Sequence, residues 1–288
     1  MKAVRVHAWN EAPRLEELPA PTPAPGRTLV RMAAATVGHI DRTVWSGRFL
    51  QAPSLPYVPG VEAAGTVLES DQFAAGERVW LRGAGLGTRG DGTWREIIDA
   101  PDGAIGRLPE GVPMEIGSAF FSPSTSAWVA LHEVAKVHAG ERVLITGASG
   151  AVGSLAMQLA RDAGAQAIAL SPDVSESADV LIDTVGGPVL AAALERVVPG
   201  GRAVLVGYTA GNELAIDIAR FLQRDVSLLP LNMFRREASG RAAAPELLAR
   251  IADGRLQLQV QPFPLADAAK ALDWITQRGH RGRAVLVP

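Results

Sequence analysis

The chain has 288 residues, long enough for two domains and a sizeable core, and its hydrophobic content of 48% is ordinary for a globular protein. A net charge of −2 gives no reason to expect a nucleic acid or an acidic membrane surface as a partner. The lack of cysteine excludes disulfides, thiolate catalysis and every cysteine-ligated metal site.

The amino-terminal stretch is charged throughout and has no apolar run of the kind found in signal peptides. Because no apolar run in the chain approaches the ~18 residues that span a bilayer, we expect a soluble, cytoplasmic protein without membrane contact. The first 120 residues have the pattern of a β-rich domain with proline-containing loops. Strands are predicted over residues 2–9, 27–37, 61–70, 76–83 and 92–101.

After residue 120 the pattern changes to short apolar strands that alternate with amphipathic helices. A helix is predicted to begin after the capping candidates Ser124, Thr125 and Ser126. The elements expected next are strands over 141–147, 166–171, 178–187, 201–208 and 225–233, helices over 151–165, 188–198, 244–254 and 266–279, and a closing strand over 283–288. This alternation is typical of a doubly wound parallel sheet.

A glycine-rich turn, VLITGASGAVG (143–153), lies directly between a predicted buried strand and a predicted helix. In this context Gly150 lets the backbone approach a pyrophosphate, Gly153 allows close packing of the helix, and the helix amino terminus offers free N–H groups. A purely structural tight turn is the competing interpretation. The cofactor contacts expected in the turn are Ala148, Ser149, Gly150, Ala151, Val152 and Gly153.

Two other enzyme classes with similar glycine motifs are excluded. Short-chain dehydrogenases need a tyrosine followed four residues later by lysine, whereas Tyr57 and Tyr208 are followed at that spacing by Val61 and Asn212. A serine-hydrolase elbow around Ser149 needs a second glycine where this chain has alanine.

Several further motifs extend the pattern over nearly the whole chain. They are PGVEAAG (59–65), AAGERVW (74–80), GTWRE (92–96), HEVAKVHAGERVLITGASGAVGSLAMQLARDAGA (132–165), VLIDTVGG (180–187), PGGRAVLVG (199–207) and GRAVLVP (282–288). Each alone is weak, but together they resemble the medium-chain dehydrogenase/reductase superfamily, specifically its zinc-free quinone oxidoreductase-like branch. The resemblance implies an α/β fold in which a GroES-like β domain (1–120 and 254–288) surrounds a Rossmann doubly wound parallel sheet (121–253).

The resemblance also identifies a shortened stretch. Family members follow the strand at 166–171 with a helix, a third strand and another helix, whereas this chain has only about eight residues before the next strand. Eight or nine extended residues reach at most about 30 Å, which closes the link but leaves no room for a helix. We therefore expect a trimmed Rossmann domain that is altered at its adenosine side.

Zinc alcohol dehydrogenases of this superfamily place two metal ligands and a proton-relay hydroxyl at positions held here by Gly38, Ile40 and Val61. The five histidines show no close metal-ligand spacing, so no metal is expected. Without a Lewis acid to lower the hydroxyl pKa, alcohol oxidation is not expected either. The branch implies instead NADPH-dependent hydride transfer to a quinone or an α,β-unsaturated carbonyl compound, including enoyl-reductase chemistry.

The superfamily builds its substrate pocket around residues 36–49. Thr43 is predicted to donate a hydrogen bond to a substrate oxygen, or else to be a plain loop threonine. His39 is a candidate for a cofactor or active-site contact, with a partly exposed histidine as the alternative. Asp41 is a catalytic candidate together with Glu62, although an ion-pair or capping role is favoured for both acids.

The resemblance implies further cofactor contacts beyond the glycine turn. Ser126, Gly207, Tyr208 and Asn232 correspond to positions near the nicotinamide, with plain packing as the alternative. Ser171 and Arg278 correspond to positions that reach the 2′-phosphate of NADPH, while Asp173 lies near the spacing of a ribose-binding acid that favours NADH. NADPH is therefore expected first, with NADH as the alternative.

Three functions remain open from the sequence. The first is a zinc-independent reductase with a small carbonyl or quinone substrate. The second is a repurposed member with weakened or lost cofactor binding that serves a binding or structural role, and the third is a non-redox lyase or cyclase. The resemblance also implies a homodimer formed through the sheet edge near residues 225–233.

Overall fold

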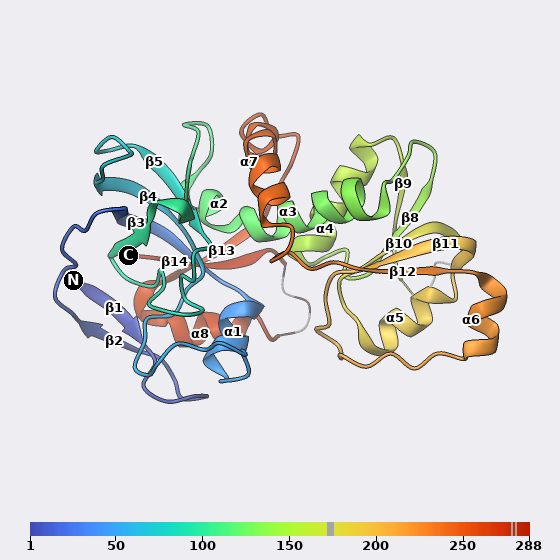
Figure 1. Ribbon diagram of the computed structural model, residues 1–288, viewed down its shortest axis with the longest axis horizontal. Helices are drawn as coiled ribbons and strands as arrows, with labels where there is room; N and C mark the ends of the chain where they lie inside the picture. Colours follow the sequence, from blue (N-terminus) through green and yellow to red (C-terminus); the bar gives the residue numbers. More distant parts are fainter. Residues whose placement is uncertain (172–175, 278, 280) are drawn as a thin grey trace. The chain divides into compact units, whose positions relative to one another are not determined.

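The structure is a computed structural model that describes residues 1–171, 176–277, 279 and 281–288 (Figure 1). Its contacts divide the chain into two compact units. Unit 1 combines Met1–Phe121 with Gln259–Pro288, and unit 2 is the continuous segment Ser122–Leu258. No helix among the described residues is long and apolar enough to cross a membrane.

Unit 1 is built on a sheet of seven described strands in the order β13–β14–β3–β4–β5–β7, with β6 also paired to β3. Strand β14 runs antiparallel to β3, with Ala284 opposite Val37, so the carboxyl-terminal residues complete a sheet that the amino-terminal residues begin. These strands are β3 (Arg27–Val37), β4 (Glu62–Glu69), β5 (Arg78–Arg82), β6 (Ile97–Pro101), β7 (Ile105–Arg107), β13 (Val260–Pro264) and β14 (Arg283–Val287).

A separate two-stranded ribbon and three described α-helices accompany this sheet. The ribbon pairs β1 (Lys2–Arg5) with β2 (Arg14–Glu17), and the helices are α1 (His39–Trp45), α2 (Met114–Ala119) and α8 (Ala268–Trp274). The sequence pattern did not predict α1 and α2, and it missed the short strands β2, β7 and β13. Strand β3 begins and ends where the sequence predicts it, whereas β6 begins five residues later than predicted.

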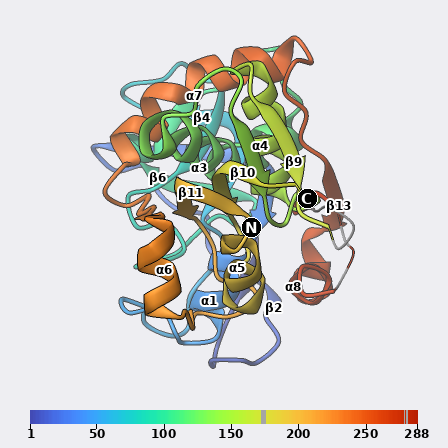
Figure 2. The ribbon, with the colours of Figure 1, turned by 90° about the vertical axis from the view of Figure 1, so that its right-hand side faces the viewer.

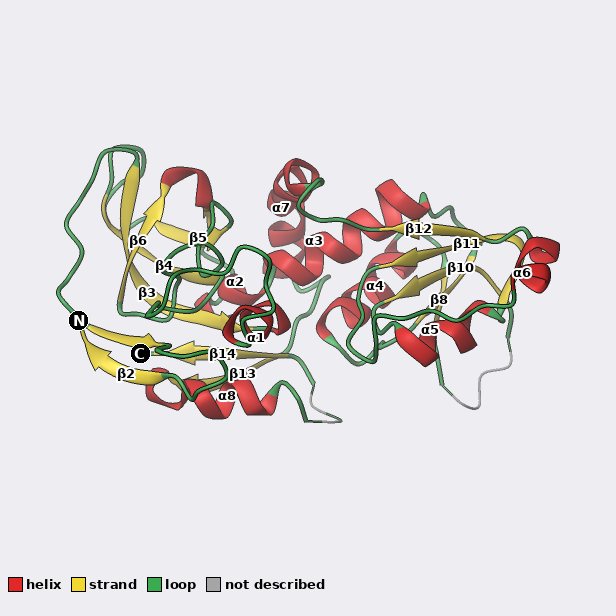
Figure 3. Ribbon diagram, turned by 60° about the horizontal axis from the view of Figure 1, so that its bottom comes forward, coloured by secondary structure: helices red, strands yellow, loops and turns green. Residues whose placement is uncertain are grey.

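Unit 2 contains a wholly parallel sheet of five described strands in the order β12–β11–β10–β8–β9, drawn as arrows that run in one direction in Figure 3. The strands are β8 (Arg142–Ile145), β9 (Gln166–Ala169), β10 (Ala178–Asp183), β11 (Val197–Leu205) and β12 (Ser227–Pro230). A complete dinucleotide-binding sheet has the order 3-2-1-4-5-6. This sheet corresponds to 2-1-4-5-6, which confirms the predicted fold class and its shortened form.

Helices cover both faces of the parallel sheet (Figure 2). Helix α4 (Ala151–Asp162) packs on β8 and β9, whereas α5 (Gly187–Leu194) packs on β10 and β11, and α6 (Ile218–Arg224) packs on β11. Unit 2 also contains α3 (Phe121–Val129) from its second residue on, the π-helical segment (Ala130–Ala135) that continues it, and α7 (Glu237–Ala252). Because α3 begins at Phe121, Ser124 to Ser126 lie inside it and are not its caps, which corrects the predicted helix start.

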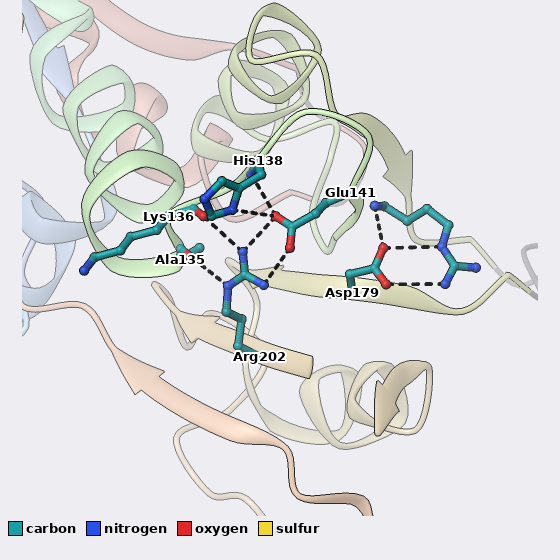
Figure 4. Close-up of polar contacts among 7 residues, drawn as sticks. Ala135, Lys136, His138, Glu141, Asp179 and Arg202 are labelled. Atoms are coloured by element: carbon teal, nitrogen blue, oxygen red, sulfur yellow. Dashed lines mark hydrogen bonds and ion pairs between the residues drawn. The ribbon is translucent and has the colours of Figure 1, made fainter. Parts of the chain in front are cut away.

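An arginine fork joins β11 to the segment before β8 (Figure 4). Arg202 of β11 donates to both carboxylate oxygens of Glu141, at 2.9 and 2.8 Å, and to the backbone carbonyls of Ala135 and Lys136. Its hydrogen bonds to Glu141 hold the pKa of that carboxyl below its usual range. One side chain thus fixes the end of the π-helical segment against the middle of the sheet.

Candidate cofactor-binding site

The glycine turn lies at the carboxyl end of β8, where parallel sheets bind their ligands. Gly147 adopts a φ of +60°, which favours glycine. A Cβ placed on Gly153 would lie 2.1 Å from the Gly147 carbonyl oxygen, so no side chain fits where α4 meets the turn. The first N–H groups of a helix, here those of Ala151, Val152 and Gly153, have no intrahelical partner and favour an anion.

A buried hydrogen-bond network holds this turn against the neighbouring strand β10. The Thr146 hydroxyl donates to Asp183 Oδ1 at 2.6 Å, and the Thr184 hydroxyl donates to the Thr146 carbonyl at 2.8 Å. The second Asp183 oxygen accepts the Gly186 N–H at 2.8 Å. Burial raises the pKa of Asp183, although these hydrogen bonds oppose the effect. The ends of β8 and β10 are therefore locked in one geometry.

Asp183, Thr146 and Thr184 were not among the sequence-predicted site residues. The signal that could have found Asp183 is an acid at the carboxyl end of a buried apolar strand, in the sequence DTVGG (183–187). Such an acid cannot stay buried without partners. In a parallel sheet, the nearest hydroxyl group belongs to the residue at the end of the neighbouring strand, which here is Thr146 after β8.

The other predicted nicotinamide-side residues of unit 2 come from several elements. Gly207 follows β11, and its N–H donates to the Asp183 carbonyl at 3.3 Å, while the adjacent Tyr208 is 68% exposed. Asn232 follows β12, and its side-chain oxygen accepts the N–H groups of Phe234 and Arg235, so it caps a turn. Ser126 lies half-buried within α3. Cofactor contacts by these residues stay predictions.

At the adenosine side, one predicted contact lies within the described residues. Ser171 is half-buried and directly follows Leu170, whose N–H donates to the Ile145 carbonyl at the end of β8. Ser171 therefore lies at the carboxyl edge of the sheet, beside the strand that carries the glycine turn. The other candidates, Arg278 and Asp173, lie outside the described residues.

In unit 1, the three catalytic candidates all lie on α1. Asp41 is 1% exposed, and its Oδ2 accepts the N–H of Gly38 at 2.8 Å, which caps the helix. Thr43 lies in this helix and not in a loop, and its hydroxyl donates to the His39 carbonyl at 2.9 Å. The His39 side chain is exposed at the first turn. Catalytic roles for these residues stay predictions.

Two buried polar atoms near α1 have no hydrogen-bond partner among the described residues, namely Asp41 Oδ1 and the Tyr57 hydroxyl. Burial raises the pKa of Asp41 to about 7, and the nearby charge of Glu62 adds to the rise. Burial also raises the pKa of Tyr57, and the charge of Asp41 contributes. Asp41 is thus a carboxyl group that changes protonation near neutral pH.

A second buried acid, Glu62, lies beside this group and is paired with cations. Arg283 of β14 donates to Glu62 Oε2 at 2.8 Å and to the Ala119 carbonyl at 2.7 Å. Arg82 Nε lies 3.8 Å from Glu62 Oε1. A Cβ placed on Gly38 would lie 2.9 Å from Arg283 Nη2, so the guanidinium fills the space beside that position. The ion-pair role expected for Glu62 is the one that this geometry shows.

Within the described part of the chain, no group of three or more His, Cys, Asp or Glu side chains could hold a metal ion. The site that the geometry defines is an anion cradle at the end of β8 in unit 2. A phosphate group fits this site, because the first N–H groups of α4 have no intrahelical partner and no side chain at Gly153 covers the backbone of the turn.

Fold and site together define a protein with a dinucleotide-binding sheet joined to a GroES-like β unit. Residues 24–110 match the family described as alcohol dehydrogenase GroES-like domain, and residues 156–286 match the family described as zinc-binding dehydrogenase. The chain belongs to the medium-chain dehydrogenase/reductase superfamily, in its quinone oxidoreductase-like branch.

Three similar proteins illustrate this membership. Quinone oxidoreductase of Sus scrofa is 28% identical, with 100% of this chain and 98% of the relative aligned. The mycocerosic acid synthase-like polyketide synthase of Mycobacterium tuberculosis is 26% identical over 92% of this chain, which spans 14% of that protein. Quinone oxidoreductase of Escherichia coli, solved in complex with NADPH, has a TM-score of 0.86 at 21% identity, and each chain is covered completely.

The alignment with the Sus scrofa protein runs over 327 positions, which is 39 more than the 288 residues of this chain, so at least that many positions face gaps in this chain.

Proposed function

We propose that this protein is an NAD(P)H-dependent oxidoreductase that reduces a quinone or an α,β-unsaturated carbonyl compound without zinc. The observation that carries the proposal is the glycine turn between β8 and α4, where no Cβ fits at position 153, in a chain of this family. When bound, a reduced nicotinamide supplies a hydride to an electron-poor carbon. The solved relative that contains NADPH supports this cofactor class.

The residues of unit 2 hold and orient the phosphates. The N–H groups of the first turn of α4 receive the negative charge, and the Asp183–Thr146 hydrogen bond keeps the turn from shifting. Ser126, Gly207, Tyr208 and Asn232 remain the proposed contacts on the nicotinamide side. In unit 1 we propose His39 as a contact of cofactor or substrate, because its side chain is exposed on α1.

Zinc independence is proposed from the side chains present. The chain has no cysteine, and the guanidinium of Arg283 lies where a side chain at position 38 would project. A metal placed there would meet a cation that is held in place by Glu62 and the Ala119 carbonyl. We therefore propose that stabilisation of the developing oxyanion comes from hydrogen-bond donors and not from a metal.

Binding and turnover test this function in two steps. Fluorescence titration of the full chain with NADPH and NADH should show saturable binding below millimolar concentration. Oxidation of the bound cofactor should then respond to a member of a panel of quinones, enones and enoyl thioesters, and it should survive a chelator. No binding of either cofactor would support a repurposed, non-redox member instead.

We also propose a cytoplasmic homodimer formed through β12. This strand lies at the edge of the parallel sheet. Exposed apolar side chains lie on α6, which precedes β12, and in the segment that follows it, namely Ile218, Leu222 and Phe234. An unpaired strand edge can pair with a second copy. Sedimentation should report a dimer, and a charge introduced as Leu222→Glu should shift it toward monomer.

A further inference from the structure

The parallel sheet of unit 2 lacks its outermost strand on one side. Strand β9 pairs only with β8, so the described sheet has one strand beyond β8 on this side and three on the other. Residues 170–177 are all that connect β9 to β10, which returns on the far side of β8. Eight residues extended to at most about 3.6 Å each reach less than about 30 Å, and a link of this length is too short for a further strand and helix.

The phosphate end of the site is complete in spite of this loss. The glycine turn follows β8, and no side chain fits at Gly153. Thr146 is hydrogen-bonded to Asp183. These groups contact the phosphates of a dinucleotide through the backbone, whichever base lies beyond them. Recognition of the phosphate attached to the nicotinamide ribose therefore does not depend on the missing strand.

At the adenosine end, the described part of the sheet has no strand beyond β9. Specific recognition there uses residues after the second strand of the sheet, an acid for the ribose hydroxyls or an arginine for a 2′-phosphate. Ser171 holds that place and is uncharged. From residue 162 to residue 195 the sequence contains no lysine or arginine that could pair with a 2′-phosphate.

We propose that the protein recognises its reductant by the dihydronicotinamide mononucleotide half, so that the 2′-phosphate is not selected and reduced nicotinamide mononucleotide can replace the dinucleotide. The proposal rests on the proposed oxidoreductase function and deepens it. In this proposal, the absence of one strand causes the loss of adenosine recognition, while the phosphate site at the start of α4 is retained.

Stepwise truncation of the ligand tests each part of the site on the full chain. Dissociation constants are measured by calorimetry for NADPH, NADH, reduced nicotinamide mononucleotide and the corresponding riboside. We expect NADPH to bind no more than about tenfold tighter than NADH, and the mononucleotide to bind within about tenfold of NADH, since a tenfold ratio corresponds to a single strong contact. The riboside should bind at least about tenfold more weakly than the mononucleotide, because it lacks the phosphate that the α4 cradle holds.

The outcomes separate this proposal from the proposed function. If NADPH binds more than tenfold tighter than NADH, or the mononucleotide more than tenfold weaker than NADH, adenosine is recognised and the inference is wrong while the oxidoreductase function stands. If mononucleotide and riboside bind equally, the phosphate cradle is assigned wrongly. If none of the four ligands binds, the proposed function fails as well.

A charge-gain variant provides an independent test of where the adenosine lies. Ser171→Arg places a cation at the end of β9, and we expect it to raise the NADPH to NADH affinity ratio at least fivefold without changing the mononucleotide affinity. Ser177→Arg is the matched control, because it adds the same charge at the exposed start of β10. An unchanged ratio in both variants would contradict the placement of adenosine beside β9.

Discussion

Asp41 combines a capping role with deep burial of its carboxyl group. It caps α1 through the Gly38 N–H, yet its second oxygen is buried without a partner among the described residues. The groups that act on its charge are Glu62, which raises its pKa, and Arg283 and Arg82, which lower it. Burial outweighs both arginines, so the folded protein retains a proton that the unfolded chain releases.

The first prediction is a pH dependence of stability that originates at Asp41. Its folded pKa of about 7 lies above the ordinary value of 3.8. The stabilisation is complete below 3.8 and is lost as pH rises through 7, because only the folded state binds the proton in between. Asp41→Asn should flatten this decline by about 2 kcal/mol or more between pH 4.5 and 8, measured by urea unfolding.

The amide oxygen of Asn can still accept the Gly38 N–H, so the Asp41→Asn variant keeps the hydrogen bond that caps α1. Glu110→Gln is the control, since it removes a carboxyl group that is 92% exposed in the same unit. If the pH profiles of Asp41→Asn and the parent protein run parallel, Asp41 is ionised throughout and the assignment is wrong.

The second prediction concerns the backbone contact between Gly153 and Gly147. A Cβ on Gly153 would meet the Gly147 carbonyl carbon at 2.6 Å, and backbone atoms cannot rotate away. Gly153→Ala should therefore destabilise unit 2 by about 2 kcal/mol or more, as overpacking does. Gly150→Ala is the matched comparison, because its nearest contact would be 3.2 Å and its φ is −76°; it should cost less than about 1 kcal/mol. Thermal unfolding measures both, and equal losses would contradict the close-packing explanation.

At the scale of elements, two arginine–carboxylate pairs, drawn with their polar contacts in Figure 4, differ in exposure. Arg202 makes a fork to Glu141 and also satisfies two backbone carbonyls, with side-chain exposures of 23% and 22% for the pair. The Arg142 guanidinium approaches Asp179 only at 3.5 Å, although the Arg142 backbone N–H donates to Asp179 at 2.8 Å, and the two side chains are 39% and 33% exposed. Charge-assisted bonds to partly buried groups contribute more than surface pairs.

The third prediction follows from this difference. Arg202→Ala should lower the free energy of unfolding by about 2 kcal/mol, because it leaves the end of the π-helical segment without its donors. Arg142→Ala should cost less than about 1 kcal/mol. Chemical denaturation at low and high salt measures both changes. A loss for Arg142→Ala as large as that for Arg202→Ala would contradict the ranking.

The sequence predicted those elements in which the apolar side chains follow the buried face. Strands β3 and β8 and helix α4 show clear periodicity because one or both faces are packed. Helix α6 spans only seven residues and has no buried residue, so its short apolar pattern was not predicted as a helix. Strand β13, VQPFP, contains two prolines that argue against a strand, yet it pairs at the sheet edge where prolines are tolerated.

The candidate site likewise has a part that the sequence predicted and a part that it did not. Sequence spacing predicted the glycine turn, because strand, turn and helix are contiguous in the chain. The Thr146–Asp183 bond joins residues 37 positions apart, and it depends on which strands become neighbours in the sheet. The shortened link was visible in the sequence, whereas the side of the sheet that it leaves open follows only from the strand order.

At the scale of the whole molecule, the two units differ in how the chain forms them. Unit 2 is continuous from Ser122 to Leu258, and one hydrophobic cluster of its own, which includes Leu144, Leu181 and Leu194, packs its sheet. Unit 1 needs both ends of the chain, since β14 lies between β13 and β3. Removing the carboxyl-terminal residues therefore takes two strands from its sheet and leaves β3 with an open edge.

The last prediction is that the units fold independently, but only one of them as a simple fragment. Residues 122–258 expressed alone should unfold cooperatively, because their sheet and core are self-contained. Residues 1–121 alone should not, whereas the same residues joined to 259–288 by a flexible linker of about ten residues should regain a cooperative transition, because the linker restores β13 and β14. Far-UV circular dichroism and urea unfolding of the three proteins measure this. If the 122–258 fragment is unfolded while the full chain is stable, or if 1–121 folds unaided, the division into units does not describe how the chain folds.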